Sequence, residues 1–374
     1  MKKKILFLYL KTWWGHVSTA KAVTKYLHDH HHDEVEVVLE DGLEDSYPFI
    51  KEIVEKWYAT LQDKWKYIYS FLYACNKNRL LAKTTQFLMK QCTEKYIQEA
   101  ILRHQPTEIV IFHFFLVQPV VEILSLMDKK IPVTTVVTDP FTPPRLWFLE
   151  KKMNYVVYSE QARDHAIDWW ISPKNIRQFP TIVDEKYSKK ISAQEVLVKK
   201  KQYHMNPNLK TTLLLGWGDG MPNGEKIVED LLALPGEREI VVVCGKNNLL
   251  YEEINYIKKT HPEKHIHVYG FIDFVYDMIS VADVIITKWW PATLMEILLL
   301  GKIPVINSYL WWQEKGNVKF VVNNGIWIYE KNREEMIKNV QKILNWEQKE
   351  YLDRLNKLAL RNGVAEFSEW LLRK

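Results

Sequence analysis

Short apolar runs alternate with helical patterns along the whole chain. In the first half they cover residues 4–10, 34–40, 108–113 and 133–138, and in the second half 211–216, 239–244, 265–269, 284–287 and 304–307. Such runs are typical of buried strands, and longer helical stretches separate most of them. Alternating strands and helices predict parallel sheets joined by right-handed crossovers, which is the α/β class.

The pattern restarts near residue 211, after a polar helix and a linker at about 203–210. With 374 residues the chain is long enough for two domains of ~150 residues each. We therefore expect two doubly wound, Rossmann-like domains that face each other across a cleft. Their expected bounds are 1–190 and 205–345, and the helices of 346–374 are expected to pack back toward the first domain.

The first apolar run follows Met1 and three lysines, as in a signal peptide, but it extends only from Ile5 to Leu10. No small-residue cleavage site follows, so the run is interpreted as a buried strand. The other apolar stretches fall short of the ~20 residues that cross a bilayer. Three cysteines without a C-x-x-C pair argue against a disulfide framework and favour a reducing compartment.

Loops that follow strands are the candidates for chemistry, because doubly wound sheets bind ligands beyond the carboxyl ends of their strands. In the first half these loops contain Gly15, His16 and Asp139. In the second half they contain Gly216, Gly218, Asp219, Pro291, Ala292 and Thr293. Proline suits the first turn of a helix, whose free N–H groups can hold phosphate.

The net charge of +5 is concentrated in one segment. Residues 56–95 carry eight basic, two acidic and eight aromatic side chains. Basic and aromatic side chains together are typical of an interfacial helix on an anionic membrane, and the alternative is an ordinary amphipathic helix with a solvated basic face. We expect 47–96 to contact such a membrane surface, and we expect no nucleic-acid partner.

Four histidines cluster with Asp29 and Asp33 between the first helix and the second strand. They are His28, His30, His31 and His32. The cluster invites a metal-site interpretation. It lies, however, on the side away from the carboxyl ends of the strands, so no metal and no cofactor is expected.

The loops together resemble the glycosyltransferases of family 28, which have the GT-B fold, in the branch of monogalactosyl- and diglucosyl-diacylglycerol synthases. In that branch a Gly-Gly-Gly-His turn follows the first strand, and a Thr-Asp pair ends a later one. The matching segments here are Trp13-Trp14-Gly15-His16, Thr138-Asp139, Gly216 to Gly220, Gly270-Phe271, Ala282-Asp283, Thr287-Lys288, Pro291 to Thr293, Glu296 and Trp312 to Asn317. A histidine that often follows Thr-Asp in the lipid branch is absent here.

The resemblance implies a role for each site residue. His16 would be the general base that deprotonates the acceptor hydroxyl, with Asp139 as a second catalytic group. A histidine whose pKa is near 6.5 suits that role at neutral pH. The donor, a UDP-sugar, would contact Gly15, Gly216, Gly218, Asp219, Phe271, Ile272, Pro291, Ala292, Thr293, Glu296, Gln313, Glu314 and Asn317. Phe271 and Ile272 would hold the uracil, and Glu296 the ribose.

The implied function is transfer of a hexose, with inversion, from a UDP-sugar to a diacylglycerol-like lipid. The enzyme would be cytoplasmic and peripheral on the inner face of the cell membrane. Alternatives are a lipid-linked GlcNAc-transferase of the peptidoglycan type or a polyprenyl-phosphosugar transferase, a UDP-GlcNAc 2-epimerase of the same fold, and a non-catalytic nucleotide-sugar-binding relative.

Tryptophan is unusually frequent and glycine unusually rare. The chain has 15 tryptophans and 13 glycines, and glycine is about half as frequent as its usual ~7%. Tryptophan stands at family glycine positions at Trp13, Trp14, Trp170, Trp217, Trp290, Trp312 and Trp327. One codon, UGA, is read as tryptophan in some genetic codes and as glycine in another. We therefore expect glycine at these positions in the functional protein, and the alternative is a divergent or inactive relative.

Overall fold

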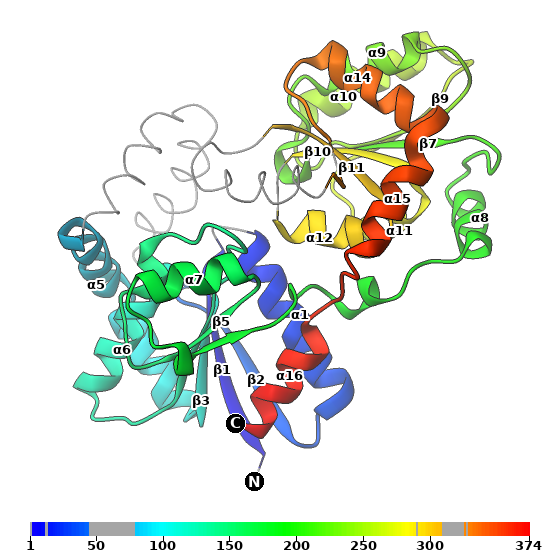
Figure 1. Cartoon of the computed structure of the whole chain (residues 1–374). Helices are drawn as coiled ribbons and strands as arrows, with labels where there is room; N and C mark the ends of the chain where they lie inside the picture. The colour runs from blue at the N-terminus through cyan, green and yellow to red at the C-terminus, as the bar shows by residue number, and fades with distance from the viewer. Residues whose placement is uncertain (1, 12–13, 45–78, 289–290, 309–324, 327) are drawn as a thin grey trace. The chain divides into compact units, whose positions relative to one another are not determined.

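The computed structural model describes residues 2–11, 14–44, 79–288, 291–308, 325–326 and 328–374. These residues form two compact units. Of the described residues, the first unit comprises those up to Glu185 together with Asn362–Lys374, and the second comprises those between Lys186 and Arg361. Each unit is built around one parallel sheet of six strands (Figure 1). This architecture confirms the expected doubly wound α/β class.

In the first unit the strands lie in the order β2-β1-β3-β4-β5-β6, all parallel. The strands are β1 (Lys3–Tyr9), β2 (Val35–Asp41), β3 (Glu108–Ile111), β4 (Val133–Val136), β5 (Asn154–Val157) and β6 (Ile176–Gln178). The chain leaves β1 toward β2 and later returns to the other side of β1 to form β3. The carboxyl ends of β1 and β3 therefore flank the switch point of the sheet, where such folds bind ligands.

Helices cover both faces of this sheet. They are α1 (Trp14–His31), α5 (Arg79–His104), α6 (Val117–Leu126), α7 (Glu160–Asp168) and α16 (Val364–Arg373). Alternate residues of β1 point to opposite faces, so Leu6 and Leu8 join one core with α5, α6 and α7. Ile5 and Phe7 join the other core with α1 and α16, two helices from opposite ends of the chain that lie side by side (Figure 1).

The second unit repeats the plan with the strand order β12-β11-β10-β7-β8-β9. Its strands are β7 (Thr211–Leu215), β8 (Glu239–Val243), β9 (His265–Tyr269), β10 (Val284–Lys288), β11 (Ile303–Ser308) and β12 (Ile328–Tyr329). Its helices are α8 (Ala193–Gln202), α9 (Gly224–Ala233), α10 (Asn248–Thr260), α11 (Val275–Val281), α12 (Pro291–Leu299), α14 (Arg333–Lys342) and α15 (Gln348–Lys357). The switch point here lies between β7 and β10.

Nine strands lie where the apolar runs predict them, whereas β5, β6 and β12 have no counterpart among those runs. The three are short, with four, three and two residues. A segment of this length shows too few positions for its period to be recognised. Within the described part of the chain, no helix has the combination of length and apolar character needed to cross a membrane.

Candidate active site

His16 lies in the first turn of α1, just beyond the carboxyl end of β1. Only 2% of its surface is exposed. Its Nδ1 atom lies 2.5 Å from the hydroxyl oxygen of Thr138, which follows β4. The structure therefore brings together two motifs that the sequence separates widely, because the carboxyl ends of parallel strands meet at one edge of the sheet. Gly15 precedes His16, and its carbonyl accepts hydrogen bonds from the hydroxyls of Ser18 and Thr19.

A second buried histidine, His113, stands against His16. It follows β3, and the two rings meet edge to face with their centroids 4.6 Å apart. The backbone N–H of Phe115 donates to His113 Nδ1, which fixes the ring as the cap of a short helical turn. The apolar run 108–113 predicts a strand that includes His113 and indicates no function for it. The available signal was a polar residue at the carboxyl end of an otherwise apolar run.

Asp139 is also buried at this edge, and a tryptophan holds it in place. The indole N–H of Trp147 donates to Asp139 Oδ2 at 2.7 Å. Trp147 is fully buried, and its ring centroid lies 6.0 Å from that of His16. A charged acceptor of this kind makes the stronger class of hydrogen bond. His16, His113, Thr138, Asp139 and Trp147 thus form one cluster, which we call the histidine site.

Burial sets the electrostatics of the histidine site. Loss of solvation lowers the pKa of His16 to about 3, although a hydrogen bond with the backbone of Phe112 raises it slightly. Burial, and secondarily the neighbouring His16, also holds the pKa of His113 well below its usual range. The expectation of a pKa near 6.5 for His16 is therefore wrong. At neutral pH the imidazole of His16 is uncharged.

This burial predicts a pH dependence of folding. The folded pKa of His16 lies below the unfolded value of ~6.5, so the unfolded chain binds the extra proton between those values. The contribution is complete above pH ~6.5 and is lost as pH falls toward ~3, by up to about 1.4 kcal/mol per pH unit. Denaturant unfolding from pH 7 to 4 should show a flatter slope for His16→Asn than for the unsubstituted protein.

His28→Asn is the matched control, because it removes an exposed histidine from the same helix. A His16→Asn variant whose stability falls with pH as steeply as that of the unsubstituted protein would contradict the burial of a neutral ring.

In the second unit a tight turn follows β7 at the switch point. Gly216 follows the strand, and Gly218 and Asp219 lie in the helical turn η6 (Trp217–Asp219). A Cβ on Gly216 would lie 2.1 Å from the carbonyl carbon of Gly220, so only glycine fits there. The hydroxyl of Thr287, on neighbouring β10, donates to the carbonyl of Leu215 at 2.9 Å and fixes the two strand ends together.

Helix α12 begins beyond β10, and its first turn contains Pro291, Ala292 and Thr293. Thr293 and Glu296 are both buried, and Glu296 lies about one turn further along the helix. The N-terminal end of a helix offers free N–H groups and the positive end of its dipole, which suit an anion. The α12 start can therefore hold a diphosphate, with a carboxylate one turn away.

Phe271 and Ile272 follow β9, on the opposite side of β7 from α12. The Phe271 ring is 59% exposed, and the ammonium of Lys246 lies 5.8 Å from its centroid. Gln313, Glu314 and Asn317 lie outside the described residues. So does most of the segment 47–96, of which α5 contributes the part from Arg79.

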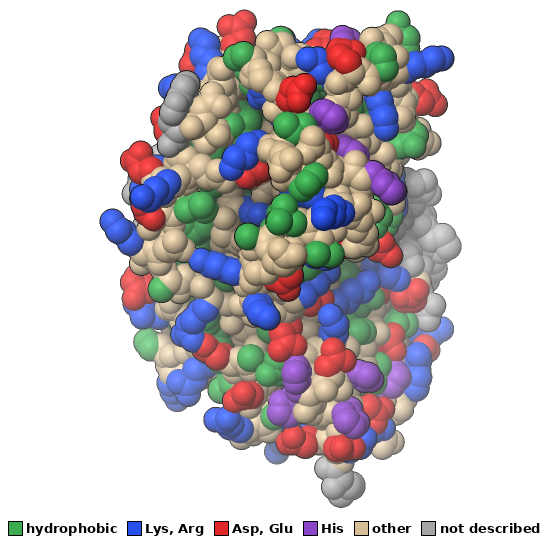
Figure 2. Space-filling view, turned by 90° about the vertical axis from the view of Figure 1, so that its right-hand side faces the viewer, with side chains coloured by type: hydrophobic (Ala, Val, Ile, Leu, Met, Phe, Trp, Pro, Cys, Tyr) green, Lys and Arg blue, Asp and Glu red, His purple; other side chains and the backbone are tan. Residues whose placement is uncertain are grey.

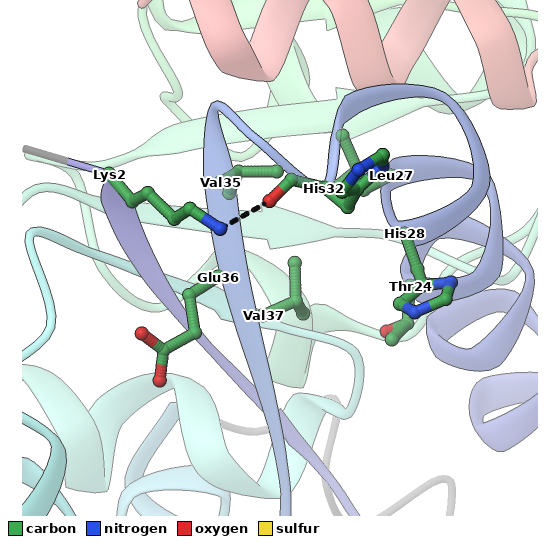
Figure 3. Close-up of a pocket in the computed structure, with 8 residues that line it drawn as sticks. All are labelled: Lys2, Thr24, Leu27, His28, His32, Val35, Glu36 and Val37. Atoms are coloured by element: carbon green, nitrogen blue, oxygen red, sulfur yellow. Dashed lines mark hydrogen bonds between the residues drawn. The ribbon is translucent and has the colours of Figure 1, made fainter.

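The histidine cluster lies at the other end of the first sheet, away from the histidine site. Figure 2 shows histidine side chains gathered among acidic ones in the lower part of the molecule. His30 bonds Glu185 and His31 bonds Glu34. Beside them a pocket lies between the end of α1 and the start of β2, and Figure 3 shows Lys2 Nζ donating to the carbonyl of His32 there. Among the described residues, no group of three or more His, Cys, Asp or Glu could hold a metal ion.

Comparison with known proteins identifies both units. Residues 16–181 match the family model of monogalactosyldiacylglycerol (MGDG) synthase. Residues 225–368 match the glycosyltransferase family 28 C-terminal domain. The first match begins at His16 and includes the whole histidine site, and the second includes α12.

Curated relatives are 25% identical to this chain. The processive diacylglycerol beta-glucosyltransferase of Bacillus licheniformis matches over 381 residues, which is 100% of this chain and 97% of that protein. The probable chloroplastic monogalactosyldiacylglycerol synthase of Nicotiana tabacum matches over 333 residues and 86% of this chain. The chain spans 61% of the length of the tobacco protein.

Solved structures support the fold. The MurG protein of Acinetobacter baumannii superimposes with a TM-score of 0.62 at 14% identity, over 100% of both chains. The HepE protein of Anabaena, in complex with UDP, superimposes with a TM-score of 0.57 at 12% identity, over 100% of this chain and 99% of that one. At these identities the likeness establishes a shared architecture.

Proposed function

Because the chain belongs to the glycosyltransferases of family 28, we propose that it transfers a hexose from a UDP-sugar to the hydroxyl of a diacylglycerol-like lipid, with inversion, at the cytoplasmic face of a membrane. The observation that supports this most directly is the combination of an MGDG synthase match over 16–181 with a family 28 C-terminal match over 225–368. The Bacillus and tobacco relatives are named for activity on diacylglycerol.

In the proposed reaction the acceptor hydroxyl oxygen attacks the anomeric carbon, the bond to the diphosphate oxygen breaks, and UDP leaves. His16 takes the proton of the attacking hydroxyl. Its burial supports this role because the lowered pKa keeps the ring unprotonated, and so able to accept a proton, at neutral pH. Thr138 and His113 position the ring through the contacts at Nδ1 and at its edge. Asp139, held by Trp147, is proposed as a second group at the acceptor.

The donor is proposed to bind at the switch point of the second unit. The first turn of α12 would hold the diphosphate, and Glu296 would accept hydrogen bonds from the ribose. The turn Gly216–Asp219 would approach the phosphates with its backbone, and the backbone of Phe271 and Ile272 would contact the uracil. Gln313, Glu314 and Asn317 are proposed to contact the sugar, because polar side chains distinguish its hydroxyls. No metal is proposed in this chemistry.

Incubation with radiolabelled UDP-glucose, UDP-galactose and UDP-GlcNAc and a panel of lipids tests the proposal. We expect the label in the lipid phase with diacylglycerol and a hexose donor. Label transferred only from UDP-GlcNAc, and only to a polyprenyl-linked acceptor, would contradict the proposed diacylglycerol acceptor and favour a GlcNAc-transferase of the peptidoglycan type. No transfer to any lipid, with UDP still bound, would favour a non-catalytic binding protein.

The proposed contact with an anionic membrane includes α5. Phe87 and Leu88 project from this helix and are more than half exposed. Large exposed apolar side chains beside basic ones are typical of a surface that enters a lipid interface. Co-sedimentation with vesicles of phosphatidylglycerol should weaken as salt rises to 1 M, where the Debye length is ~3 Å.

The double variant Phe87→Ser with Leu88→Ser should weaken co-sedimentation further. The control is Leu126→Ser, which removes an equally exposed side chain at the end of α6. Vesicle binding that is insensitive to salt, to lipid charge and to the double variant would contradict a role for this segment at the membrane.

A further inference from the structure

Two tryptophans adopt a backbone conformation that tryptophan rarely enters. The φ angles of Trp170 and Trp217 are +64° and +59°, in the left-handed region. Asp, Asn and His enter this region more readily than other residues, and Asp128, Asn223 and His204 do so here, as do Gln105 and Ala359 at smaller angles. For a bulky residue such an angle is an outlier, because the Cβ approaches the following carbonyl oxygen. Glycine has no Cβ and adopts the region freely.

Trp170 stands at the position after a helix end where glycine is most strongly preferred. At the end of α7, the N–H of Trp170 donates to the carbonyl of Ile167 at 2.8 Å, and the N–H of Ile171 donates to that of Ala166 at 3.0 Å. This pair of bonds defines the Schellman motif, whose left-handed residue is usually glycine. The buried side chains of Ile171 and Ala166 join one core and complete the motif. The indole of Trp170 is 71% exposed.

Trp217 lies in the turn between β7 and α9, between two glycines. The carbonyl of Trp217 accepts from the N–H of Gly220 at 2.9 Å, and a Cβ on Gly245 would lie 2.1 Å from the same oxygen. The backbone of the turn is therefore tightly packed. The indole nitrogen of Trp217 is buried with no hydrogen-bond partner among the described residues. An unpaired buried donor of this kind destabilises the fold.

Two other tryptophans, Trp147 and Trp370, pack in the cores of the first unit. Trp147 is fully buried and its N–H donates to Asp139. Trp370 packs in α16 against Phe179 and Phe367, with ring centroids 5.7 and 5.9 Å away. Neither has a positive φ. Trp147 and Trp370 are thus used by the cores, whereas Trp170 and Trp217 have the backbone conformation that favours glycine.

We infer that the functional protein carries glycine at positions 170 and 217, because UGA codons of its gene are read as glycine. At 217 the inference rests on the proposed function and deepens it, since glycine would open the turn that is proposed to meet the donor phosphates. At 170 it is independent of any activity. The same inference applies to Trp13, Trp14, Trp290, Trp312 and Trp327, which stand at glycine positions of the family pattern.

The codons test the inference directly. We expect UGA at 170 and 217 and UGG at 147 and 370. Peptides from the native source should then be lighter at the first two positions by the mass difference between tryptophan and glycine. UGG at 170 and 217 would overturn the inference, whether or not the protein transfers sugar.

Thermal unfolding of the chain as printed gives a second, activity-independent measurement. Trp170→Gly and Trp217→Gly should each raise Tm by about 1–3 °C, since relief of one left-handed bulky residue is divided by the large unfolding entropy of a protein of this length. Trp370→Gly is the matched control and should lower Tm, because it removes a packed ring from a core. A fall in Tm for both Trp170→Gly and Trp217→Gly would overturn the inference.

Discussion

His16→Ala is expected to lower turnover by about 10²–10⁴-fold and to leave UDP binding nearly unchanged. The proposed base is deleted, while the described groups that are proposed to hold the diphosphate and the ribose, the first turn of α12 and Glu296, lie in the second unit. The loss should appear in kcat with saturating donor, measured as hexose transfer to diacylglycerol. UDP binding is measured separately by calorimetry.

Two further variants distinguish a base from a structural residue. His28→Ala removes an exposed histidine from the same helix and should leave turnover unchanged. Thr138→Val keeps the shape of the side chain but removes the hydroxyl that contacts Nδ1, and it should lower kcat and displace its pH profile. Turnover of His16→Ala equal to that of the unsubstituted enzyme, in a protein with the same Tm, would remove His16 from the mechanism.

Glu296→Gln is expected to raise the KM for the UDP-sugar about 10- to 150-fold. A hydrogen bond to a charged group is worth about 1.5–3 kcal/mol, and the buried carboxylate of Glu296 is proposed to accept such bonds from the ribose. With saturating donor, kcat should change little, because the ribose does not react. Initial rates at varied donor concentration measure both parameters.

A dideoxy analogue identifies the contact. UDP without its ribose hydroxyls should bind the Glu296→Gln variant and the unsubstituted protein equally, because the bonded groups are then absent from both complexes. Glu252→Gln, on the exposed side of α10, is the control for loss of one carboxylate and should leave KM unchanged. If Glu296→Gln weakened binding of UDP and of the dideoxy analogue to the same degree, the ribose contact would be excluded.

The fold follows from local sequence to a large extent. The strand β1 is continuously apolar because helices cover both of its faces, and this pattern is visible without knowledge of its neighbours. The short strands β5 and β6 were not predicted, since three or four residues carry no recognisable period. β5 forms because β4 offers an edge for pairing, and β6 in turn pairs with β5, so both depend on the assembled sheet.

The candidate site was predictable in part. His16 and Asp139 were candidates because their loops follow apolar runs that predict strands, and the resemblance added Thr138 only as part of the Thr138-Asp139 pair. His113 was missed because it ends an apolar run and therefore resembled a strand residue. Its contact with His16 depends on the direct pairing of β3 with β1, and the local sequence does not specify this strand order.

The α/β class, the restart of the pattern at the second unit, the glycine-poor composition and the loops in which chemistry is expected are all visible in the amino-acid sequence. These features are encoded in periodicity and in residue types over short distances. Three features are visible only in the folded chain: His16 is buried and uncharged, Trp147 holds Asp139, and the backbone at Trp170 and Trp217 is left-handed. Solvation, side-chain pairing and turn conformation all depend on atoms that distant parts of the chain bring together, so no local pattern could specify them.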